Sequence, residues 1–103
     1  MNFLKQLFSL GTDTDLTELI NKGAFLVDVR TASEFASGSV KGAMNIPLDT
    51  VSNQLTKFKN KSHIIVFCQS GMRSSQATSI LKQNGFTNVT NGGSWRSVSA
   101  YVK

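Results

Sequence analysis

The single cysteine of the chain, Cys68, lies where a short apolar run meets a polar loop. The run before it, residues 64–67, is β-branched at three of its four positions and too short for a helix. It therefore predicts a strand buried on both faces, as the strands of parallel sheets are. After the loop, Ala77, Ile80 and Leu81 recur with a helical period. A thiol is thus expected between the end of a strand and the start of a helix.

A thiol in that position favours its ionised form. The unpaired N–H groups and the positive end of the helix dipole attract an anion, and Arg73 adds a full positive charge. Such surroundings lower the pKa of a cysteine from about 8.5 into a range of roughly 3.5–7.5. Gly71 can adopt the positive φ that turns the N–H groups of the loop inward, and Ser74 or Ser75 can cap the helix. The alternative role for Cys68 is that of a small buried hydrophobic residue.

Residues 68–74, with the sequence CQSGMRS, resemble the active-site loop of the rhodanese-like sulfurtransferases in their small single-domain form. Other segments resemble that family in the same order, and together they span about residues 14–102. Two positions depart from the family pattern. Ser39 stands where members often carry histidine, and Trp95 follows the glycine pair more closely than usual. The matching segments are VDVR at residues 27–30 with Glu34 and Phe35, GSVKGAMNIP at residues 38–47, and NGG at residues 91–93 with Trp95.

The resemblance implies a sulfurtransferase that works by covalent catalysis. The Cys68 thiolate would attack the sulfane sulfur of a small anionic, thiosulfate-like donor, and the resulting persulfide would pass its sulfur to a thiol or to cyanide. Arg73 would bind the donor, and backbone N–H groups of the loop would hold the persulfide. No organic cofactor is implied. Besides the catalytic pair Cys68 and Arg73, the predicted substrate-binding residues are Gln69, Ser70, Gly71, Met72 and Ser74.

Three further residues are expected to support this loop structurally. Asp28 ends a predicted strand and Arg30 follows at once, so the simplest interpretation is a hydrogen-bonded pair that holds neighbouring loops. The resemblance implies the same kind of role for Arg30 and for Glu34. Direct catalysis by these residues is the alternative.

Other functions remain open at this level. Cysteine-dependent phosphatases and arsenate reductases of related form also use a loop closed by arginine. Related phosphatases, as the resemblance implies, have five residues between the cysteine and the arginine, whereas this chain has four, and one residue spans up to about 3.5 Å. A persulfide carrier that receives sulfur from a relay protein and a binding module that has lost the chemistry are the remaining hypotheses.

The composition is that of one folded domain, with 103 residues, 40% hydrophobic and 17% charged. We expect the rhodanese-like domain over residues 14–103, after an amphipathic extension at residues 1–13. The net charge of +5 is spread along the chain, so we expect it to steer small anions rather than to bind nucleic acid or a membrane. One cysteine and one histidine cannot form a zinc cluster, so no metal is expected. A poor match to a signal peptide predicts a cytoplasmic location.

Strands that alternate with helices predict an α/β fold, a small parallel sheet flanked by helices on both faces. In such folds ligands bind beyond the carboxyl ends of the strands, which is where Cys68 lies. In chain order we expect a helix from Asp15 to Gly23, a strand at 24–29, a helix with a capping box from Thr31 to Gly38, a strand at 42–46, a helix through Val51, Leu55 and Phe58, the strand at 64–67, a helix ending at Asn84 and Gly85, a strand at 87–90, a turn at 91–94, and a last helix that buries Trp95, Val98 and Val102.

Overall fold

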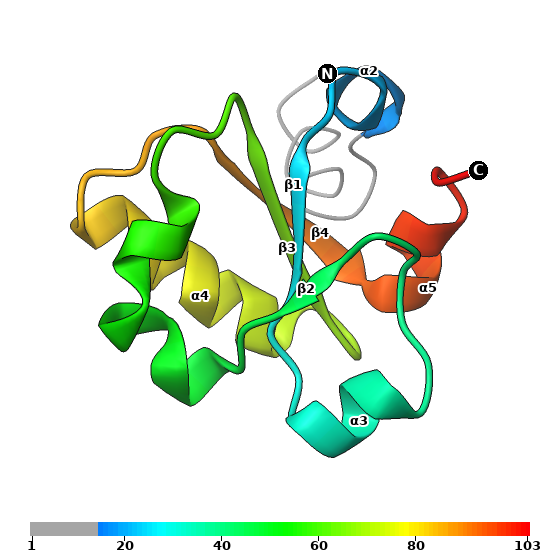
Figure 1. Ribbon diagram of the computed structural model, residues 1–103, viewed down its shortest axis with the longest axis horizontal. Coiled ribbons are helices and arrows are strands. Elements are labelled where there is room, and N and C mark those ends of the chain that lie inside the picture. Colours follow the sequence, from blue (N-terminus) through cyan, green and yellow to red (C-terminus); the bar gives the residue numbers. More distant parts are fainter. Residues whose placement is uncertain (1–14) are drawn as a thin grey trace, which may run out of the picture.

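A parallel sheet forms the middle layer of the molecule (Figure 1). The computed structural model describes residues 15–103, so the predicted extension at residues 1–13 lies outside the described residues. Each neighbouring pair of strands is parallel, in the order β2-β1-β3-β4. The predicted α/β fold with a small parallel sheet is confirmed. The strands are β1 (Phe25–Asp28), β2 (Met44–Asn45), β3 (Ile64–Cys68) and β4 (Val89–Ser94).

Helices cover both faces of this sheet (Figure 1). The long helix α4 and two 3-10 segments, η1 and η2, lie on one face, and α2 and α5 lie on the other. The short helix α3 lies at the carboxyl end of β1. The helices are α2 (Thr17–Asn21), α3 (Ala32–Ala36), α4 (Met72–Gln83) and α5 (Trp95–Ser99), and the 3-10 segments are η1 (Leu48–Asn53) and η2 (Leu55–Phe58).

The central strand β3 contributes to two hydrophobic cores, because its side chains alternate between the two faces. All five of its residues are buried. Ile64 and Val66 pack with Leu81 of α4 on one face, while Ile65 and Phe67 pack with Val98 of α5 on the other. The Cys68 loop therefore begins from the most deeply buried strand of the described chain, which fixes its position relative to both layers.

Helix α4 begins earlier than the sequence predicted. Its N-cap is Gly71, whose φ of 101° is the positive value expected of that glycine, and the Gly71 carbonyl accepts the N–H of Ser75 at 3.0 Å. Ser74 was predicted as a possible cap, but it lies within the first turn and is buried. Its hydroxyl faces the interior, so it is free to interact with the cysteine loop.

Two other segments differ from the prediction. Residues 48–58 form η1 and η2 instead of an α-helix, because the spacing of Leu48, Val51, Leu55 and Phe58 by three and four residues also suits 3-10 turns. Residues 91–94 were predicted as a turn but belong to β4, which runs to Ser94.

The glycine pair in β4 explains the second difference. The register of β3 and β4 shifts there: Val66 pairs with Asn91, and Phe67 pairs with Gly93, so Gly92 is the extra residue. A Cβ at Gly92 would lie 2.7 Å from Val98 Cγ2 and 2.9 Å from Ile65 Cγ2. Glycine is needed because a strand and a helix approach its Cα closely, not because the chain turns.

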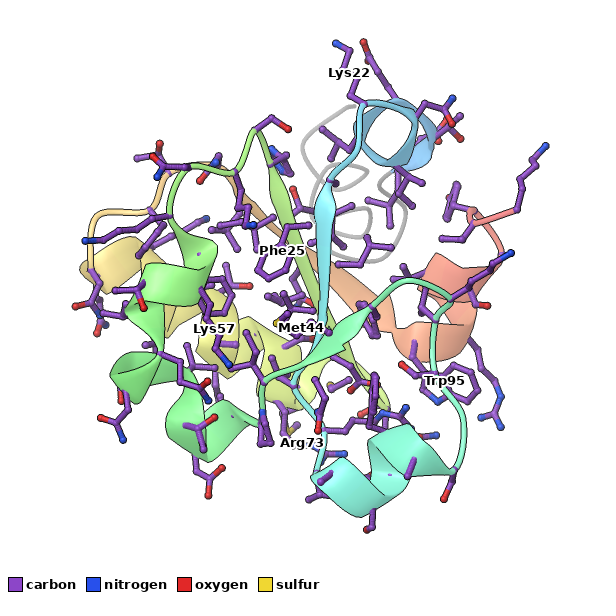
Figure 2. All side chains as sticks on the ribbon, viewed as in Figure 1. Lys22, Phe25, Met44, Lys57, Arg73 and Trp95 are labelled. Atoms are coloured by element: carbon purple, nitrogen blue, oxygen red, sulfur yellow. The ribbon has the colours of Figure 1, made fainter. Side chains whose placement is uncertain are left out.

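The polar side chains of the candidate site lie at the carboxyl ends of the strands. Figure 2 shows Arg73 and Trp95 near α3, whereas Phe25 and Lys22 lie toward the opposite end of the sheet. Trp95 packs against the core of the α5 face, as predicted. No helix among residues 15–103 is long and apolar enough to cross a membrane. In the same part of the chain, no group of three or more histidine, cysteine or acidic side chains is placed to hold a metal ion.

Candidate active site

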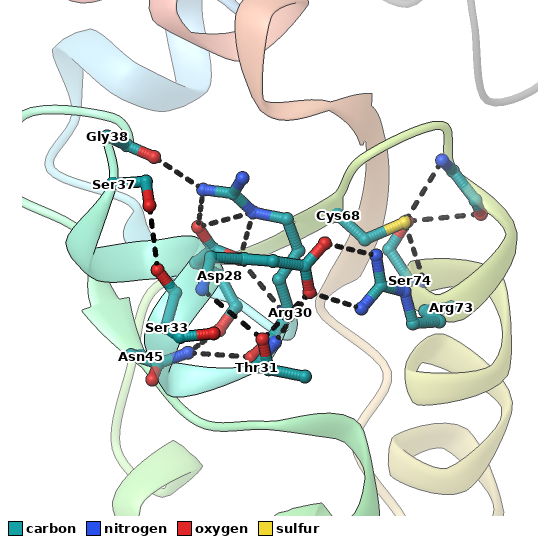
Figure 3. Close-up of polar contacts among 12 residues, drawn as sticks. Asp28, Arg30, Thr31, Ser33, Ser37, Gly38, Asn45, Cys68, Arg73 and Ser74 are labelled. Carbon is teal, nitrogen blue, oxygen red and sulfur yellow. Dashed lines mark hydrogen bonds and ion pairs between the residues drawn. The ribbon is translucent and has the colours of Figure 1, made fainter.

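The sulfur of Cys68 lies inside a loop that points N–H groups at it. Cys68 is the last residue of β3 and is only 1% exposed. Its Sγ accepts the backbone N–H of Gly71 at 3.0 Å and that of Ser74 at 3.4 Å, and it lies 3.5 Å from Ser74 Oγ (Figure 3). Strand, loop and first helical turn thus converge on one sulfur atom.

These contacts determine the acidity of the thiol. Burial raises the pKa of the Cys68 thiol, but hydrogen bonds from the Ser74 side chain and from the backbone N–H groups of Ser74, Ser70 and Gly71 lower it by more. The pKa therefore lies below its usual value, as the sequence predicted from the helix start. A lowered pKa makes ionisation easier, and the thiolate is the nucleophilic form of cysteine.

The predicted loop residues do not all contact the sulfur. The N–H groups of Gly71 and Ser74 lie within 3.4 Å of it, and the Ser70 N–H also lowers its pKa, whereas the side chains of Gln69, Ser70 and Met72 are exposed, that of Met72 to 75%. Their role in binding a donor or acceptor stays a prediction.

Arg73 points along the loop toward α3 and pairs with Glu34. Arg73 Nη1 and Nη2 donate to Glu34 Oε1 and Oε2 at 2.8 and 3.1 Å. The hydrogen bonds from Arg73, followed by that from the Thr31 N–H, lower the pKa of Glu34 to about 2, and Glu34 in turn raises the pKa of Arg73. Both side chains are about one third exposed, so the guanidinium is oriented by Glu34 yet still reachable from solvent.

The same carboxylate fixes the start of α3. Thr31 and Glu34 form the predicted capping box, in which the Thr31 N–H donates to Glu34 Oε1 and the Glu34 N–H donates to Thr31 Oγ1. Glu34 therefore joins the helix that follows β1 to the arginine that closes the cysteine loop. The supporting role that the resemblance implied for Glu34 stays a prediction.

Asp28 and Arg30 form the buried pair that their sequence positions suggested. Arg30 Nη2 donates to Asp28 Oδ2 at 2.7 Å and to the Gly38 carbonyl at 2.6 Å (Figure 3). Ser39, where the family often has histidine, donates its hydroxyl to the same Asp28 oxygen at 2.6 Å. The pair ties the end of β1 to the segment after α3, and among the described residues no hydrogen bond joins it to Cys68, so its structural role stays a prediction.

The sequence did not single out Asn91, yet its side chain contacts the loop. Asn91 Nδ2 donates to the Gly71 carbonyl at 3.2 Å, and Asn91 Oδ1 accepts the hydroxyl of Ser74 at 2.6 Å. The available signals were the resemblance of residues 91–93 to a family segment and an amide next to a glycine pair, which we interpreted as a turn. If the strand predicted at residues 87–90 had included one more residue, the prediction would have placed Asn91 beside the carboxyl end of β3.

A groove of about 620 Å³ adjoins the site on the α4 face. Arg73 is one of its lining residues, together with the apolar Leu48 and Ile80, and Cys68 is not among them. The groove therefore borders Arg73 and not the sulfur itself.

Comparison with known proteins places this geometry in a family. The family model described as "Rhodanese-like domain" matches residues 12–99. The chain is 35% identical over 75 residues to the thiosulfate sulfurtransferase PspE of Escherichia coli, an alignment that covers 71% of this chain and 72% of that protein. The structure of a human single-domain sulfurtransferase, TSTD1, superposes with a TM-score of 0.69 at 30% identity, and the match covers 84% of this chain and 91% of that one. The chain belongs to the rhodanese-like domain family.

Some relatives are considerably longer. The chain is 35% identical over 68 residues to an uncharacterized protein of Bacillus subtilis, YqhL, an alignment that covers 66% of this chain but only 54% of that protein. The family relationship therefore concerns the rhodanese-like domain, and the activity of this particular chain has to be argued from its own site.

Proposed function

We propose that the chain is a sulfurtransferase that carries sulfur as a persulfide on Cys68. The observation that supports this most directly is the environment of the sulfur, which receives the N–H groups of Gly71 and Ser74 at the end of β3. An inward set of N–H donors stabilises an anion that forms at that point, either the thiolate or the terminal sulfur of a persulfide. The family relationship and the names of its relatives support the same class of reaction.

The reaction would proceed in two half-reactions. In the first, the Cys68 thiolate attacks the outer sulfur of thiosulfate, a sulfur–sulfur bond forms to Cys68, the bond within thiosulfate breaks and sulfite leaves. In the second, the thiolate of an acceptor, or cyanide, attacks the outer sulfur and the Cys68 thiolate leaves. The exposed rim of Gln69, Ser70 and Met72 would border the reactants, and Arg73 would attract the anionic donor.

The short loop favours sulfur over phosphate. Four residues separate Cys68 from Arg73, and Gly71 and Ser74 already lie within 3.4 Å of the sulfur. A persulfide adds one atom about 2 Å beyond Sγ, whereas a phosphocysteine adds a group with three further oxygens. We also propose a cytoplasmic location, because a reducing compartment keeps the thiol available.

Intact mass spectrometry tests the first half-reaction. Incubation with thiosulfate should add the mass of one sulfur atom, and cyanide should remove it. Cys68→Ser should not gain this mass, because a serine oxygen cannot carry a persulfide. An unchanged mass in a correctly folded wild-type protein would refute the proposed activity and favour a binding module.

A further inference from the structure

The hydroxyl of Ser74 lies among three possible partners but has only one hydrogen to donate. Ser74 Oγ lies 2.6 Å from Asn91 Oδ1, 3.1 Å from the Gly71 carbonyl oxygen and 3.5 Å from Cys68 Sγ. Only the first distance is typical of a short O–H···O hydrogen bond. The Asn91 oxygen is therefore the favoured acceptor while the sulfur is a thiol, and the hydroxyl can donate to a thiolate only by turning away from Asn91.

The orientation of the Asn91 amide is fixed by its other neighbours. Asn91 Oδ1 accepts the Gly93 N–H at 2.9 Å, and Asn91 Nδ2 donates to the Gly71 carbonyl at 3.2 Å. A flipped amide would set its NH₂ group against the Gly93 N–H and its oxygen against the Gly71 carbonyl oxygen. The atom that faces Ser74 is therefore the oxygen, which can only accept.

We propose that Asn91 is a positioning residue that competes with the Cys68 sulfur for the hydrogen of the Ser74 hydroxyl. While the sulfur is a thiol, the S–H donates to Ser74 Oγ and the hydroxyl donates to Asn91 Oδ1. When the proton leaves the sulfur, the hydroxyl hydrogen turns to the thiolate, and Asn91 Oδ1 keeps only the Gly93 N–H. The cost of releasing the hydrogen from Asn91 opposes ionisation of Cys68.

The proposal rests on the proposed function, in which the Cys68 thiolate is both nucleophile and leaving group. Because Asn91 can take back the hydrogen, the Cys68 thiolate is stabilised less than it would be by Ser74 alone. This matters because a very stable thiolate would be a weaker nucleophile. The charged groups that face the loop are Arg73 of α4, Glu34 of α3 and Asp28 of β1, the last paired with Arg30. Strand β4 contributes the neutral Asn91.

The test measures thiol ionisation and does not require sulfur transfer. The rate of alkylation by iodoacetamide, followed against pH, reports the pKa of Cys68, and the chain has no other cysteine. Ser74→Ala should raise the pKa, because the thiolate loses its hydroxyl donor. Asn91→Ala should lower it, with a roughly three- to tenfold faster alkylation below the wild-type pKa, as expected for releasing one hydrogen bond. Asn91→Asp should raise it, because a carboxylate holds the hydrogen more firmly and adds negative charge.

The opposite pKa shifts expected for Asn91→Ala and Asn91→Asp distinguish competition for the Ser74 hydrogen from simple support of the loop. Asn91→Ala and Asn91→Asp both remove the amide donor to the Gly71 carbonyl, so loss of that contact alone predicts the same direction for both. In a Ser74→Ala background Asn91→Ala should leave the pKa unchanged. Asn88→Ala, which removes an amide bonded to the Lys61 carbonyl at the far end of β4, is the matched control and should behave as wild type.

Two results would overturn the proposal. The first is an Asn91→Ala protein, folded by circular dichroism, whose thiol pKa is unchanged or raised. The second is a fall in pKa of the same size with and without Ser74. If Asn91→Ala does not fold, the near-isosteric Asn91→Asp decides: its upward shift should be larger with Ser74 present than in Ser74→Ala, and equal shifts refute the competition. Failure of thiosulfate to load wild-type Cys68 would instead refute the proposed function.

Discussion

Replacing Arg73 with alanine should weaken sulfur loading without abolishing it. Two of the five N–H donors of the guanidinium are engaged with Glu34, which leaves three for an anionic donor. Removing one charge-assisted contact of about 1.5–3 kcal/mol corresponds to a roughly ten- to hundredfold loss of kcat/KM with thiosulfate. Loading should persist, because the N–H groups of Gly71 and Ser74 still hold the sulfur.

The ion pair adds a second effect that can be measured separately. In Arg73→Ala the Glu34 carboxylate loses its partner and leaves a negative charge beside the loop, which repels an anionic donor. Glu34→Gln in the Arg73→Ala background should therefore recover part of the activity, and the recovery should shrink as salt rises. Glutamine is also compatible with the third position of a capping box, so α3 should be kept.

Steady-state kinetics with thiosulfate and cyanide would measure both effects. Lys82→Ala is the matched control, because Lys82 lies in the last turn of the same helix and its loss changes the net charge equally. A neutral sulfur donor should be less affected by Arg73→Ala than thiosulfate. If Arg73→Ala turns over thiosulfate as fast as wild type, then Arg73 only supports the structure and our assignment of the donor site is wrong.

Three further predictions follow from single features of the structure. An aryl phosphate should be turned over marginally or not at all, because the loop has four residues between Cys68 and Arg73, and turnover above that with thiosulfate and cyanide would contradict the loop-length argument. Gly92→Ala should lower the free energy of unfolding by roughly 1–3 kcal/mol, because the added Cβ would lie 2.7 Å from Val98 and 2.9 Å from Ile65. Urea unfolding would measure this loss of stability. An unchanged stability would mean that α5 moves away easily. The pKa of Glu34 is lowered from 4.5 to about 2, so the stability that its carboxylate contributes is present above pH 4.5 and is lost as the pH falls toward 2. The difference in the free energy of unfolding between wild type and Glu34→Gln should therefore shrink between pH 4.5 and pH 2. A difference that stays constant over that range would refute the ion pair.

The sequence alone predicted the fold class because its strongest signals come from burial. Residues 64–67 are apolar without interruption since β3 is covered on both faces, and the capping box at Thr31 identified the start of α3 from local chemistry alone. The segment at 48–58 was less predictable. A 3-10 turn and an α-helix bury residues at nearly the same intervals over so few turns, so spacing could not distinguish them.

The candidate site was predictable where its chemistry is local and unpredictable where it depends on packing. Cys68, Gly71 and Arg73 are close together in the chain, so the strand end, the positive φ and the charge could be inferred from their order. The bidentate contact between Arg73 and Glu34 joins residues 39 positions apart, and only the resemblance hinted at it.

Asn91 was missed because glycine has two structural uses that look alike in a sequence. A Gly-Gly pair after a polar residue is typical of a turn, since glycine takes positive φ without cost. Here Gly92 permits close packing of β4 against Val98, and a Cβ on Gly71 would lie only 3.4 Å from Gly93 Cα, so the end of β4 presses against the cysteine loop. The strand therefore continues past the point where the turn was expected, and this continuation brings the Asn91 amide within hydrogen-bonding distance of Ser74. Packing between β4 and the cysteine loop, which the sequence does not reveal, is what brings Asn91 into contact with Ser74 and Gly71.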